Sequence, residues 1–350
     1  MTAPLKIALT ADPELPVPPK LYGGIERIID MLVRGLVERG HDVTLFAHPK
    51  SASAGRLIPW KGASSRSPAD TLSNAISLAR AVASDSFDIV HSFSRIAYLA
   101  TILPISLPKI MSYQREISPQ TVRWGYVLSR GTLSFTAISH WMMEPVQNIG
   151  RWDMIPNGVP LDRYAFRAEV APDAPLVFLG RIEEIKGPHL AIEIARRTGR
   201  KLIIAGNIPA EKRAWVESNV LQHVDGDRIS FIGPVDDAQK DDLLGRAAAL
   251  LMPIIWEEPF GIVMAEAMAC GTPVLGLSRG AVPEVVENGV SGFVGDDINA
   301  LVMAVDRLPQ VDRRACRDRV EKFYSDQAVV GAYEQLYYRR IQGRSSSYRT

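Results

Sequence analysis

This sequence of 350 residues has few cysteines and no long apolar run, and its first residues do not resemble a signal peptide. Cys270 and Cys316 are the only cysteines, too few for a disulfide scaffold or a cysteine-ligated zinc site, and they indicate a reducing compartment. No apolar run reaches the roughly 18 residues of a membrane-spanning helix. The first residues, Met1 to Lys6, lack the apolar segment of a signal peptide. We therefore expect a cytoplasmic protein, for which peripheral contact with a membrane stays open.

An excess of charge of either sign is also lacking. The 40 lysines and arginines nearly balance the 39 aspartates and glutamates, which gives a formal net charge of +1. Nothing here suggests a nucleic acid as partner. The composition is that of an ordinary globular chain, 47% hydrophobic and 23% charged, and its length favours two domains with separate cores.

Short apolar segments alternate with helical patterns along most of the chain. A helical stripe runs from Ile25 to Val37 and ends at Gly40. Further helices are expected over residues 71–83, 140–148 and 301–341, and a polar surface excursion over 51–69. The expected strands cover residues 5–10, 43–47, 87–90, 109–113, 134–138, 176–180, 201–206, 229–233, 249–253 and 273–276. This alternation predicts an α/β fold of open, doubly wound parallel sheets, whose ligands bind beyond the carboxyl ends of the strands.

The stretch from Trp256 to Gly276 is the most informative part of the sequence. Pro259 suits the first position of a helix, and the Ala- and Met-rich segment that follows favours one. Gly271 lies just beyond the last apolar turn, where helices end in a left-handed residue. The stretch therefore predicts one helix–strand unit of a parallel sheet.

Two carboxylates flank the first turn of this expected helix. Glu258 precedes it and Glu266 lies about two turns inside, so the two would be separated by roughly 10 Å along the axis. Between them lie the free N–H groups of the first turn, at the positive end of the helix dipole. This order matches the hydroxyls, phosphates and hydroxyls of a sugar nucleotide. The alternative is an amphipathic helix with Glu258 solvated and Glu266 on its polar side, but Glu266 stands among apolar residues, where a buried carboxylate needs partners.

The segment from Glu258 to Glu266 resembles the Glu-x7-Glu signature of the retaining glycosyltransferases of family 4. Residues 269–274 and 282–293 resemble the same family. The resemblance implies the GT-B fold, with two Rossmann-like domains facing a cleft. It also implies transfer of a sugar from a nucleotide-diphosphate donor to a hydroxylated acceptor, with retention and without metal or cofactor. A UDP-sugar is favoured over a GDP- or ADP-sugar as donor, in glycan, glycolipid, glycoside or polysaccharide biosynthesis.

A second motif follows the expected strand at 176–180. Arg181 and Lys186 lie in the loop that enters the next helix, where two cations suit a diphosphate whose charge grows as it leaves. Solvated loop charges are the alternative. The Gly-Arg-x4-Lys-Gly spacing resembles the phosphate-binding loop of the family, so the functional interpretation is favoured.

The resemblance implies a role for each candidate catalytic residue. Arg181 and Lys186 would stabilise the leaving diphosphate, Glu258 would hold hydroxyls of the donor sugar, and Glu266 would hold those of the ribose. His91 lies at a strand end that should face the cleft, and it resembles the His of the family's Asp-x-Val-His segments; a structural role is its alternative. No residue is assigned as a covalent nucleophile.

Backbone groups complete the expected donor site. A glycine pair opens the first helix, where amides can approach an anion, and the loop after 229–233 is where relatives hold the nucleotide base. The donor-binding residues are Gly23, Gly24, Gly233, Pro234, Phe260, Gly261, Ile262, Val263 and Glu266. Glu26 and Gln114 are the candidate contacts of the sugar or acceptor. No metal is expected, because Asp236-Asp237 and Asp296-Asp297 are interpreted as a helix cap and a surface turn.

The resemblance divides the chain into three parts. Residues 1–157 would form an N-terminal Rossmann-like acceptor domain, and residues 158–325 a Rossmann-like domain for the nucleotide sugar. Residues 326–350 would form a helix that returns to the first domain, followed by a frayed tail.

Two positions depart from the family pattern. Gln114 stands where many relatives carry a His, and a Gln can bind hydroxyls but cannot donate a proton as an imidazolium does. Arg279-Gly280 stands where Gly-Gly or Gly-Ser is usual. Gln114 keeps open a second function, a sugar-nucleotide-binding protein without transfer activity. A nucleotide-sugar epimerase on the same fold is a third.

Overall fold

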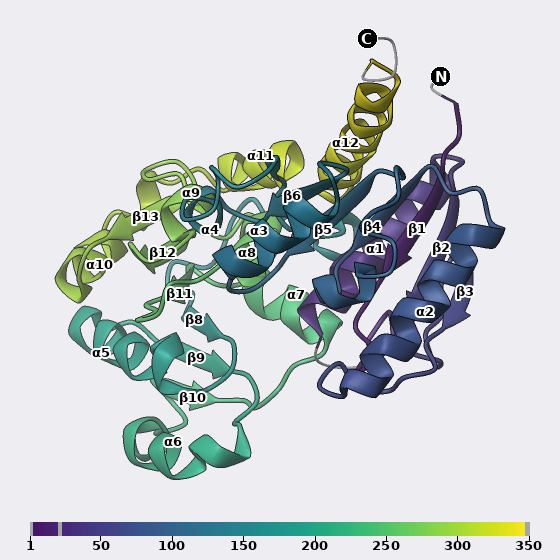
Figure 1. Cartoon of the computed structure of the whole chain (residues 1–350). Helices are drawn as coiled ribbons and strands as arrows, with labels where there is room; N and C mark the ends of the chain where they lie inside the picture. Colours follow the sequence, from purple (N-terminus) through teal and green to yellow (C-terminus); the bar gives the residue numbers. More distant parts are fainter. Residues whose placement is uncertain (1–2, 20–22, 347–350) are drawn as a thin grey trace. The chain divides into compact units, whose positions relative to one another are not determined.

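A computed structural model of the chain describes residues 3–19 and 23–346 (Figure 1). The chain divides into two compact units. Unit 1 comprises Met1–Asn157 and Asp326–Thr350, and unit 2 comprises Gly158–Ser325. Of the predicted tail, the residues from 347 onward lie outside the described part.

Unit 1 contains a seven-stranded parallel sheet in the order β3-β2-β1-β4-β5-β6-β7. Its strands are β1 (Lys6–Thr10), β2 (Asp42–Ala47), β3 (Arg56–Pro59), β4 (Ile89–Ser92), β5 (Lys109–Tyr113), β6 (Leu133–Ala137) and β7 (Trp152–Met154). Its helices are α1 (Gly24–Glu38), α2 (Pro68–Ser84), α3 (Pro119–Leu128), α4 (His140–Met143) and α12 (Asp326–Ser346), with a short 3-10 helix η1 (Ile96–Leu99). The strand order reverses between β1 and β4, and such switch points are where doubly wound sheets bind ligands.

The last helix of the chain packs against the first in unit 1 (Figure 1). Arg39, just after α1, donates from Nη1 to Glu334 of α12 at 2.7 Å. His41 contacts the other oxygen of Glu334 at 2.9 Å. Tyr333 and Tyr337 of the same helix are buried, so α12 belongs to the core of unit 1 although it is remote in sequence.

Unit 2 contains a six-stranded parallel sheet in the order β10-β9-β8-β11-β12-β13. Its strands are β8 (Leu176–Leu179), β9 (Leu202–Ala205), β10 (Ile229–Phe231), β11 (Ala249–Met252), β12 (Val274–Leu277) and β13 (Gly292–Gly295). Its helices are α5 (Pro188–Thr198), α6 (Arg213–Asn219), α7 (Asp237–Gly245), α8 (Ile262–Ala269), α9 (Val282–Val285), α10 (Ile298–Val305) and α11 (Arg313–Phe323). The 3-10 helices are η2 (Leu161–Arg163), η3 (Glu184–Lys186), η4 (Ala210–Lys212), η5 (Leu221–His223) and η6 (Leu308–Gln310). Here the order reverses between β8 and β11.

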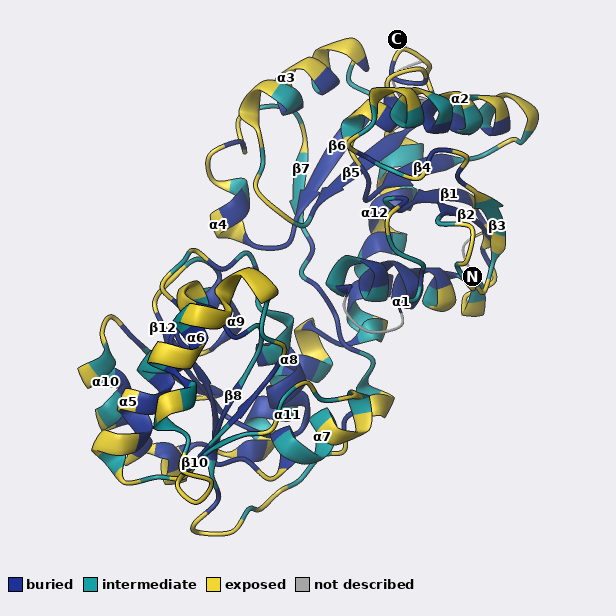
Figure 2. Cartoon of the chain, turned by 90° about the horizontal axis from the view of Figure 1, so that it is seen from below, coloured by how far each residue is buried: buried dark blue, intermediate teal, exposed yellow. Residues whose placement is uncertain are grey.

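The predicted α/β fold of open parallel sheets is confirmed, whereas several elements were missed. The polar segment 51–69 contains β3, an edge strand whose side chains are exposed or half-buried and which therefore lacks an apolar run. The edge strands β7 and β13 are short and were not predicted either. Helix α4 ends at Met143 instead of Asn148. Figure 2 shows that burial is concentrated in the two sheets.

Candidate active site

The predicted phosphate loop and Glu258 follow neighbouring strands of unit 2. Arg181 and Lys186 follow β8, and Glu258 follows β11, which pairs with β8 in parallel register. The carboxyl ends of parallel neighbours meet at the same edge of a sheet, and the sheet of unit 2 changes direction between these two strands. The backbone joins the two loops, since Ile255 N–H donates to the Ile185 carbonyl at 3.0 Å.

Lys186 and Glu258 are in direct contact. Lys186 Nζ lies 2.6 Å from Glu258 Oε2, and the indole N–H of Trp256 donates to the same oxygen at 3.0 Å. Lys186 Nζ also lies 4.5 Å from the centre of the Trp256 ring, a cation–π contact. Sequence reasoning identified Lys186 and Glu258 but neither their contact nor Trp256, although this tryptophan opens the motif and was a visible signal.

Gly280 packs closely against the backbone of Glu258. Gly280 has φ +54°, and a Cβ there would lie 2.3 Å from the Glu258 carbonyl oxygen. The next residue, Ala281, donates its N–H to that oxygen at 2.8 Å. The geometry therefore requires glycine at position 280, whereas Arg279 is half-exposed and lies 3.7 Å from Glu257. Of the two positions 279 and 280, the departure from the family pattern therefore falls on the one where the backbone does not require glycine.

Arg181 stands apart from the Lys186–Glu258 pair. Its side chain is 40% exposed and lies 2.9 Å from Glu183, which is buried. Within the described residues no hydrogen bond or ion pair joins Arg181 to Lys186 or Glu258. Arg181 is therefore separate from the Lys186–Glu258 contact, and its predicted role stays a prediction.

The helix between the two glutamates begins later than predicted. Helix α8 starts at Ile262 behind Gly261, which has a left-handed φ of 75°, so Pro259 is not its first residue. Phe260 points into the core, where it is 2% exposed and lies 5.5 Å from the Tyr324 ring. These tertiary constraints override the preference of proline for the first helical position. The first-turn N–H groups are those of Ile262 and Val263. Glu258 lies outside the helix, so the predicted separation of Glu258 and Glu266 along a helix axis does not apply.

Glu266 lies inside α8, largely buried, and has two partners. The Tyr164 hydroxyl donates to its Oε1 at 2.7 Å, and Lys240 Nζ contacts the same oxygen at 2.5 Å. Lys240 Nζ is also 5.6 Å from the centre of the Tyr164 ring. The prediction that a buried carboxylate here needs partners is confirmed. Sequence reasoning could not name Tyr164 and Lys240, because both come from other elements.

Burial and the Glu266 carboxylate both raise the pKa of Tyr164 well above its usual value. The Tyr164 hydroxyl therefore keeps its proton at neutral pH and acts as a donor. In each of the two glutamates one oxygen accepts from two donors. Within residues 3–19 and 23–343 no hydrogen bond reaches Glu258 Oε1 or Glu266 Oε2.

The predicted base-binding loop follows β10 at the edge of the sheet of unit 2. Gly233 has φ +76°, and its carbonyl accepts from Gly206 N–H at 2.8 Å. Pro234 is exposed. The loop is therefore held by the neighbouring loop after β9, with one face open to solvent.

The predicted residues of unit 1 surround the start of α1 and the end of β5. A Cβ at Gly23 would meet Glu26 Oε2 at 2.8 Å, so the glycine pair approaches this carboxylate closely. Glu26 is buried; burial raises its pKa and the nearby Asp12 raises it further. Gln114 lies directly after β5 and lines a pocket of about 390 Å³ together with Asp12 and Tyr113. These placements are compatible with an acceptor site and do not test it.

His91 lies in the core of unit 1, and the expectation that it faces a cleft is wrong. The side chain is fully buried, with Nδ1 2.7 Å from the Tyr337 hydroxyl and Nε2 2.6 Å from Ser112 Oγ. Burial lowers the pKa of His91 to about 3, so the ring is neutral. Helix α12, from the far end of the sequence, covers this strand end with Tyr333 and Tyr337. We therefore do not propose a catalytic role for His91.

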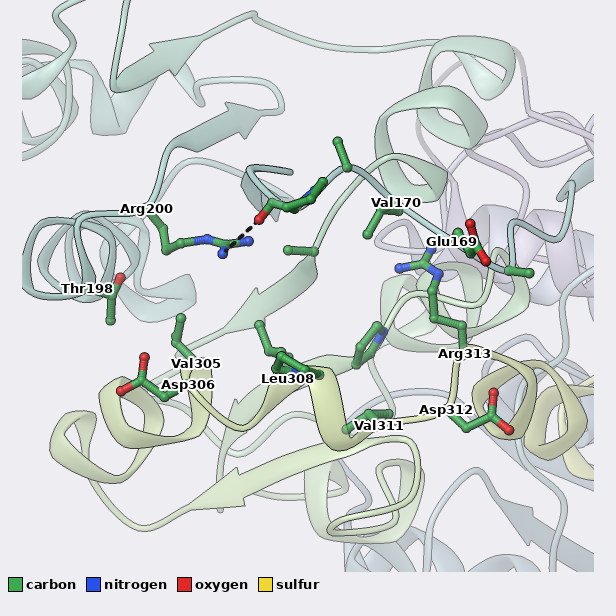
Figure 3. Close-up of a pocket in the computed structure, with 16 residues that line it drawn as sticks. Glu169, Val170, Thr198, Arg200, Val305, Asp306, Leu308, Val311, Asp312 and Arg313 are labelled. Carbon is green, nitrogen blue, oxygen red and sulfur yellow. Dashed lines mark hydrogen bonds between the residues drawn. The ribbon is translucent and has the colours of Figure 1, made fainter.

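One pocket of unit 2, of about 600 Å³, has Arg200, Leu308 and Arg313 among its lining residues (Figure 3). Two of its lining residues, Ala248 and Pro273, immediately precede β11 and β12, so the pocket lies at the amino ends of the strands. None of the predicted site residues lines it. It is therefore not the candidate donor site.

The two acidic pairs act as helix caps. Asp236 accepts from Gln239 N–H and forms a capping box at the start of α7, as predicted. Asp297 caps α10 through Ala300 N–H, so the second pair belongs to a helix start instead of a free turn. In the described ranges no cluster of three or more residues that could hold a metal occurs. No helix in that part of the chain has the length and apolarity to cross a bilayer.

Two family models match the chain in succession. Residues 22–163 match "Glycosyltransferase Family 4", and residues 166–321 match "Glycosyl transferases group 1". A similar solved structure is that of AviGT4, a glycosyltransferase involved in avilamycin A biosynthesis. It is 26% identical with a TM-score of 0.74, over 97% of this chain and 99% of that one.

Curated relatives are similar over a shorter range. The glycogen synthase of Mycobacterium tuberculosis is 33% identical over 199 residues, which cover 53% of this chain and 47% of the relative. The D-inositol 3-phosphate glycosyltransferase of Mycolicibacterium smegmatis is 30% identical over 208 residues, 53% of this chain and 48% of the relative. This chain spans about half the length of the curated relatives it matches.

Two Rossmann-like units with these sheet orders define the GT-B class of folds, and this chain has that fold. With both halves matched and the Glu258–Glu266 signature in place, the chain belongs to the glycosyltransferases of family 4.

Proposed function

We propose that this protein transfers a sugar from a nucleotide-diphosphate donor, a UDP-sugar by preference, to a hydroxylated acceptor, with retention and without a metal. The observation that carries the proposal is the Lys186–Glu258 contact at the carboxyl ends of β8 and β11. It joins a cation that suits a phosphate to a carboxylate that suits sugar hydroxyls. The family membership of the chain supports the same activity, and by analogy a cytoplasmic role in glycan, glycolipid or glycoside biosynthesis.

Charge development explains why cations are needed here. In the proposed step the bond between the anomeric carbon and the diphosphate oxygen breaks, and its electron pair stays on the diphosphate. Lys186 and Arg181 would stabilise this growing negative charge more than that of the intact donor, which lowers the barrier. The acceptor oxygen forms its bond to the anomeric carbon on the same face, and its proton passes to an oxygen of the departing diphosphate.

The two carboxylates would position the donor at either end. Glu258 Oε2 is held by Lys186 and Trp256, which leaves Oε1 for hydroxyls of the donor sugar. Glu266 Oε1 is held by Tyr164 and Lys240, which leaves Oε2 for hydroxyls of the ribose. The first-turn N–H groups of α8 lie between the two glutamates in the sequence and suit the diphosphate.

A second candidate function is binding of a sugar nucleotide without transfer. The observation in its favour is Gln114, which lines the pocket of unit 1 and cannot supply a proton as an imidazolium does. The third, an epimerase, has no specific observation in its favour beyond the fold.

A nucleotide screen with the purified chain separates these functions. Thermal stability and nucleotide release are measured with UDP, GDP, ADP and their glucose conjugates. At ~100 Kd the right donor should add roughly 2.7 kcal/mol of stability. Stabilisation by UDP-glucose with release of UDP supports transfer, stabilisation without release supports the binding protein, and an isomerised nucleotide sugar in NMR spectra supports the epimerase.

Two results would contradict the proposal outright. One is the absence of stabilisation by every nucleotide and nucleotide sugar tested. The other concerns the metal: turnover lost in EDTA and restored by magnesium or manganese would overturn the metal-independent step. The variant Arg181→Ala is a further kinetic test. We expect its kcat to fall by about 10²- to 10³-fold, as for a lost electrostatic stabiliser.

A further inference from the structure

Helix α3 of unit 1 exposes three large apolar side chains on one face. Trp124, Val127 and Leu128 are 59%, 60% and 53% exposed. Their spacing of three and four residues places them side by side on one face of a helix, and we call them the α3 stripe. In Figure 2 the helix is drawn largely in the colour of exposed residues. Contiguous apolar side chains exposed to this degree indicate a contact surface.

The opposite face of α3 packs against unit 1, and this packing keeps the stripe directed toward solvent. Val122 and Gly125 are buried. A Cβ at Gly125 would lie 2.2 Å from Ile96 and 3.2 Å from Leu133, so the helix sits as close to η1 and β6 as glycine allows. The Ser118 side chain caps the first turn. Because the helix is seated tightly through this face, it cannot turn to bury the stripe.

Along the chain, the charged side chains nearest the stripe are arginines. No Asp or Glu occurs in the sequence between Glu116 and Glu144. Arg123 and Arg130, at either end of the stripe, are exposed, and in the described part of the chain neither has an ion-pair partner. An apolar stripe between two arginines without ion-pair partners is complementary to a surface whose outer layer is anionic and whose inner layer is apolar.

We propose that α3 docks the protein on the surface of a bilayer that contains anionic lipid. Trp124, Val127 and Leu128 enter the boundary between headgroups and acyl chains, and Arg123 and Arg130 pair with lipid phosphates. A second copy of the chain is the main competing occupant. Three half-exposed side chains on a ten-residue helix offer far less than the roughly 800 Å² per partner of a stable dimer.

Docking through α3 has a consequence for the acceptor, and this consequence rests on the proposed function. Ser118 and Thr121, at the start of the helix, line the same pocket as Gln114. A bilayer bound to the stripe therefore lies beside the pocket. An acceptor hydroxyl on a lipid would be presented there.

Vesicle flotation of the full chain tests the docking. We expect flotation with phosphatidylcholine vesicles that contain phosphatidylglycerol, little with phosphatidylcholine alone, and weaker flotation as salt rises. Trp124→Ser and the double change Val127→Ser, Leu128→Ser should each weaken partitioning about tenfold or more. Arg123→Gln, which leaves the stripe intact, should weaken it about fivefold.

Equally exposed apolar residues elsewhere supply matched controls. Leu72 on α2 is 58% exposed and Met303 on α10 is 65% exposed, and their changes to Ser should leave flotation unchanged. Circular dichroism verifies folding. No flotation of the wild type, or equal flotation of the stripe variants, overturns the proposal. So does a dimer in light scattering that Trp124→Ser dissociates in the absence of vesicle binding.

The outcome is separable from that of the proposed function. Stabilisation by UDP-glucose, measured without vesicles, should be the same in the wild type and the stripe variants. Flotation without any nucleotide binding would support docking and contradict the glycosyltransferase proposal. Nucleotide binding without flotation would do the reverse.

Discussion

Each of the two glutamates of the signature is held by one lysine and one aromatic side chain. Glu258 contacts Lys186 and Trp256, and the lysine lies over the indole ring. We call these three residues the first cluster. In the second cluster Glu266 contacts Lys240 and Tyr164, and again the lysine lies over the aromatic ring. In each cluster the lysine and the aromatic N–H or O–H contact the same carboxylate oxygen.

The clusters differ in how far the lysine charge is neutralised. Lys240 lies near a second carboxylate, Asp237, at 3.6 Å, whereas in the described residues Lys186 is paired with Glu258 alone. Arg181 adds a second cation to the loop of Lys186. Similar contacts can therefore serve two purposes. Under the proposed function, Lys186, which has a single carboxylate partner in the described residues, would act on the leaving group, whereas Lys240 would hold the Glu266 carboxylate in place.

The largest expected effect comes from removing each lysine in turn. Lys186→Met should lower kcat by about 10²- to 10³-fold, because a fixed cation is lost where negative charge develops. Lys240→Met should act mainly through the donor KM and leave kcat within about tenfold, because its loss disturbs a ground-state contact. Steady-state kinetics with a varied donor measures both.

Circular dichroism and thermal melting of the two lysine variants are the control for folding. A fall in kcat of the same size in both variants would contradict the distinction between the clusters. Turnover near that of the wild type in Lys186→Met would remove the leaving-group role of that residue.

The next effect concerns which part of the donor each glutamate binds. Glu258→Gln should weaken binding of the sugar nucleotide while leaving that of the free nucleotide diphosphate nearly unchanged. Glu266→Gln should weaken both. Loss of a charged acceptor should cost roughly 1.5–3 kcal/mol in each case. Calorimetric titration with UDP and UDP-glucose tests this, and equal losses of UDP binding in the two variants would show that the assigned roles are wrong.

Smaller effects are expected from the aromatic partners. Tyr164→Phe removes a hydroxyl that donates to a buried carboxylate and should lower the free energy of unfolding by about 1–2 kcal/mol. Trp256→Phe keeps a ring beside Lys186 and should cost less than Trp256→Ala, which also removes a cation–π contact of about 0.5–1 kcal/mol. Urea unfolding measures these differences. Equal stability of the two Trp256 variants would show that the ring contributes nothing.

The smallest effect is expected at Arg279, beside the first cluster. Its side chain is 51% exposed and its nearest carboxylate atom is 3.7 Å away, so Arg279→Gly should change stability by less than about 0.5 kcal/mol. Gly280→Ala is the contrasting variant, since its Cβ would collide with the Glu258 backbone. Thermal melting of the two variants should separate them clearly. A large loss in Arg279→Gly would mean that this departure from the family pattern has a structural role.

Local patterns in the sequence predicted the α/β class and most of the strands. Continuous apolar runs such as Leu176 to Leu179 predicted buried parallel strands, and the stripe from Ile25 to Val37 predicted α1. The need of Glu266 for partners also followed from its apolar neighbours in the chain. These inferences succeeded because each depends on residues within one or two turns or strands, where side-chain periodicity decides which face is buried.

Contacts between distant residues were decided only by the tertiary structure. Tyr164 and Glu266 are 102 positions apart, and His91 and Tyr337 are 246 apart. The start of α8 likewise depends on the burial of Phe260 against Tyr324, which outweighs the helix preference of Pro259. The partners of a buried charge and the exposure of a strand end depend on which element covers them, and that is set by packing across the whole unit. The sequence by itself therefore determined the parallel sheets and the Glu-x7-Glu frame, and the tertiary structure decided which side chains hold each glutamate and which histidine is closed to a ligand.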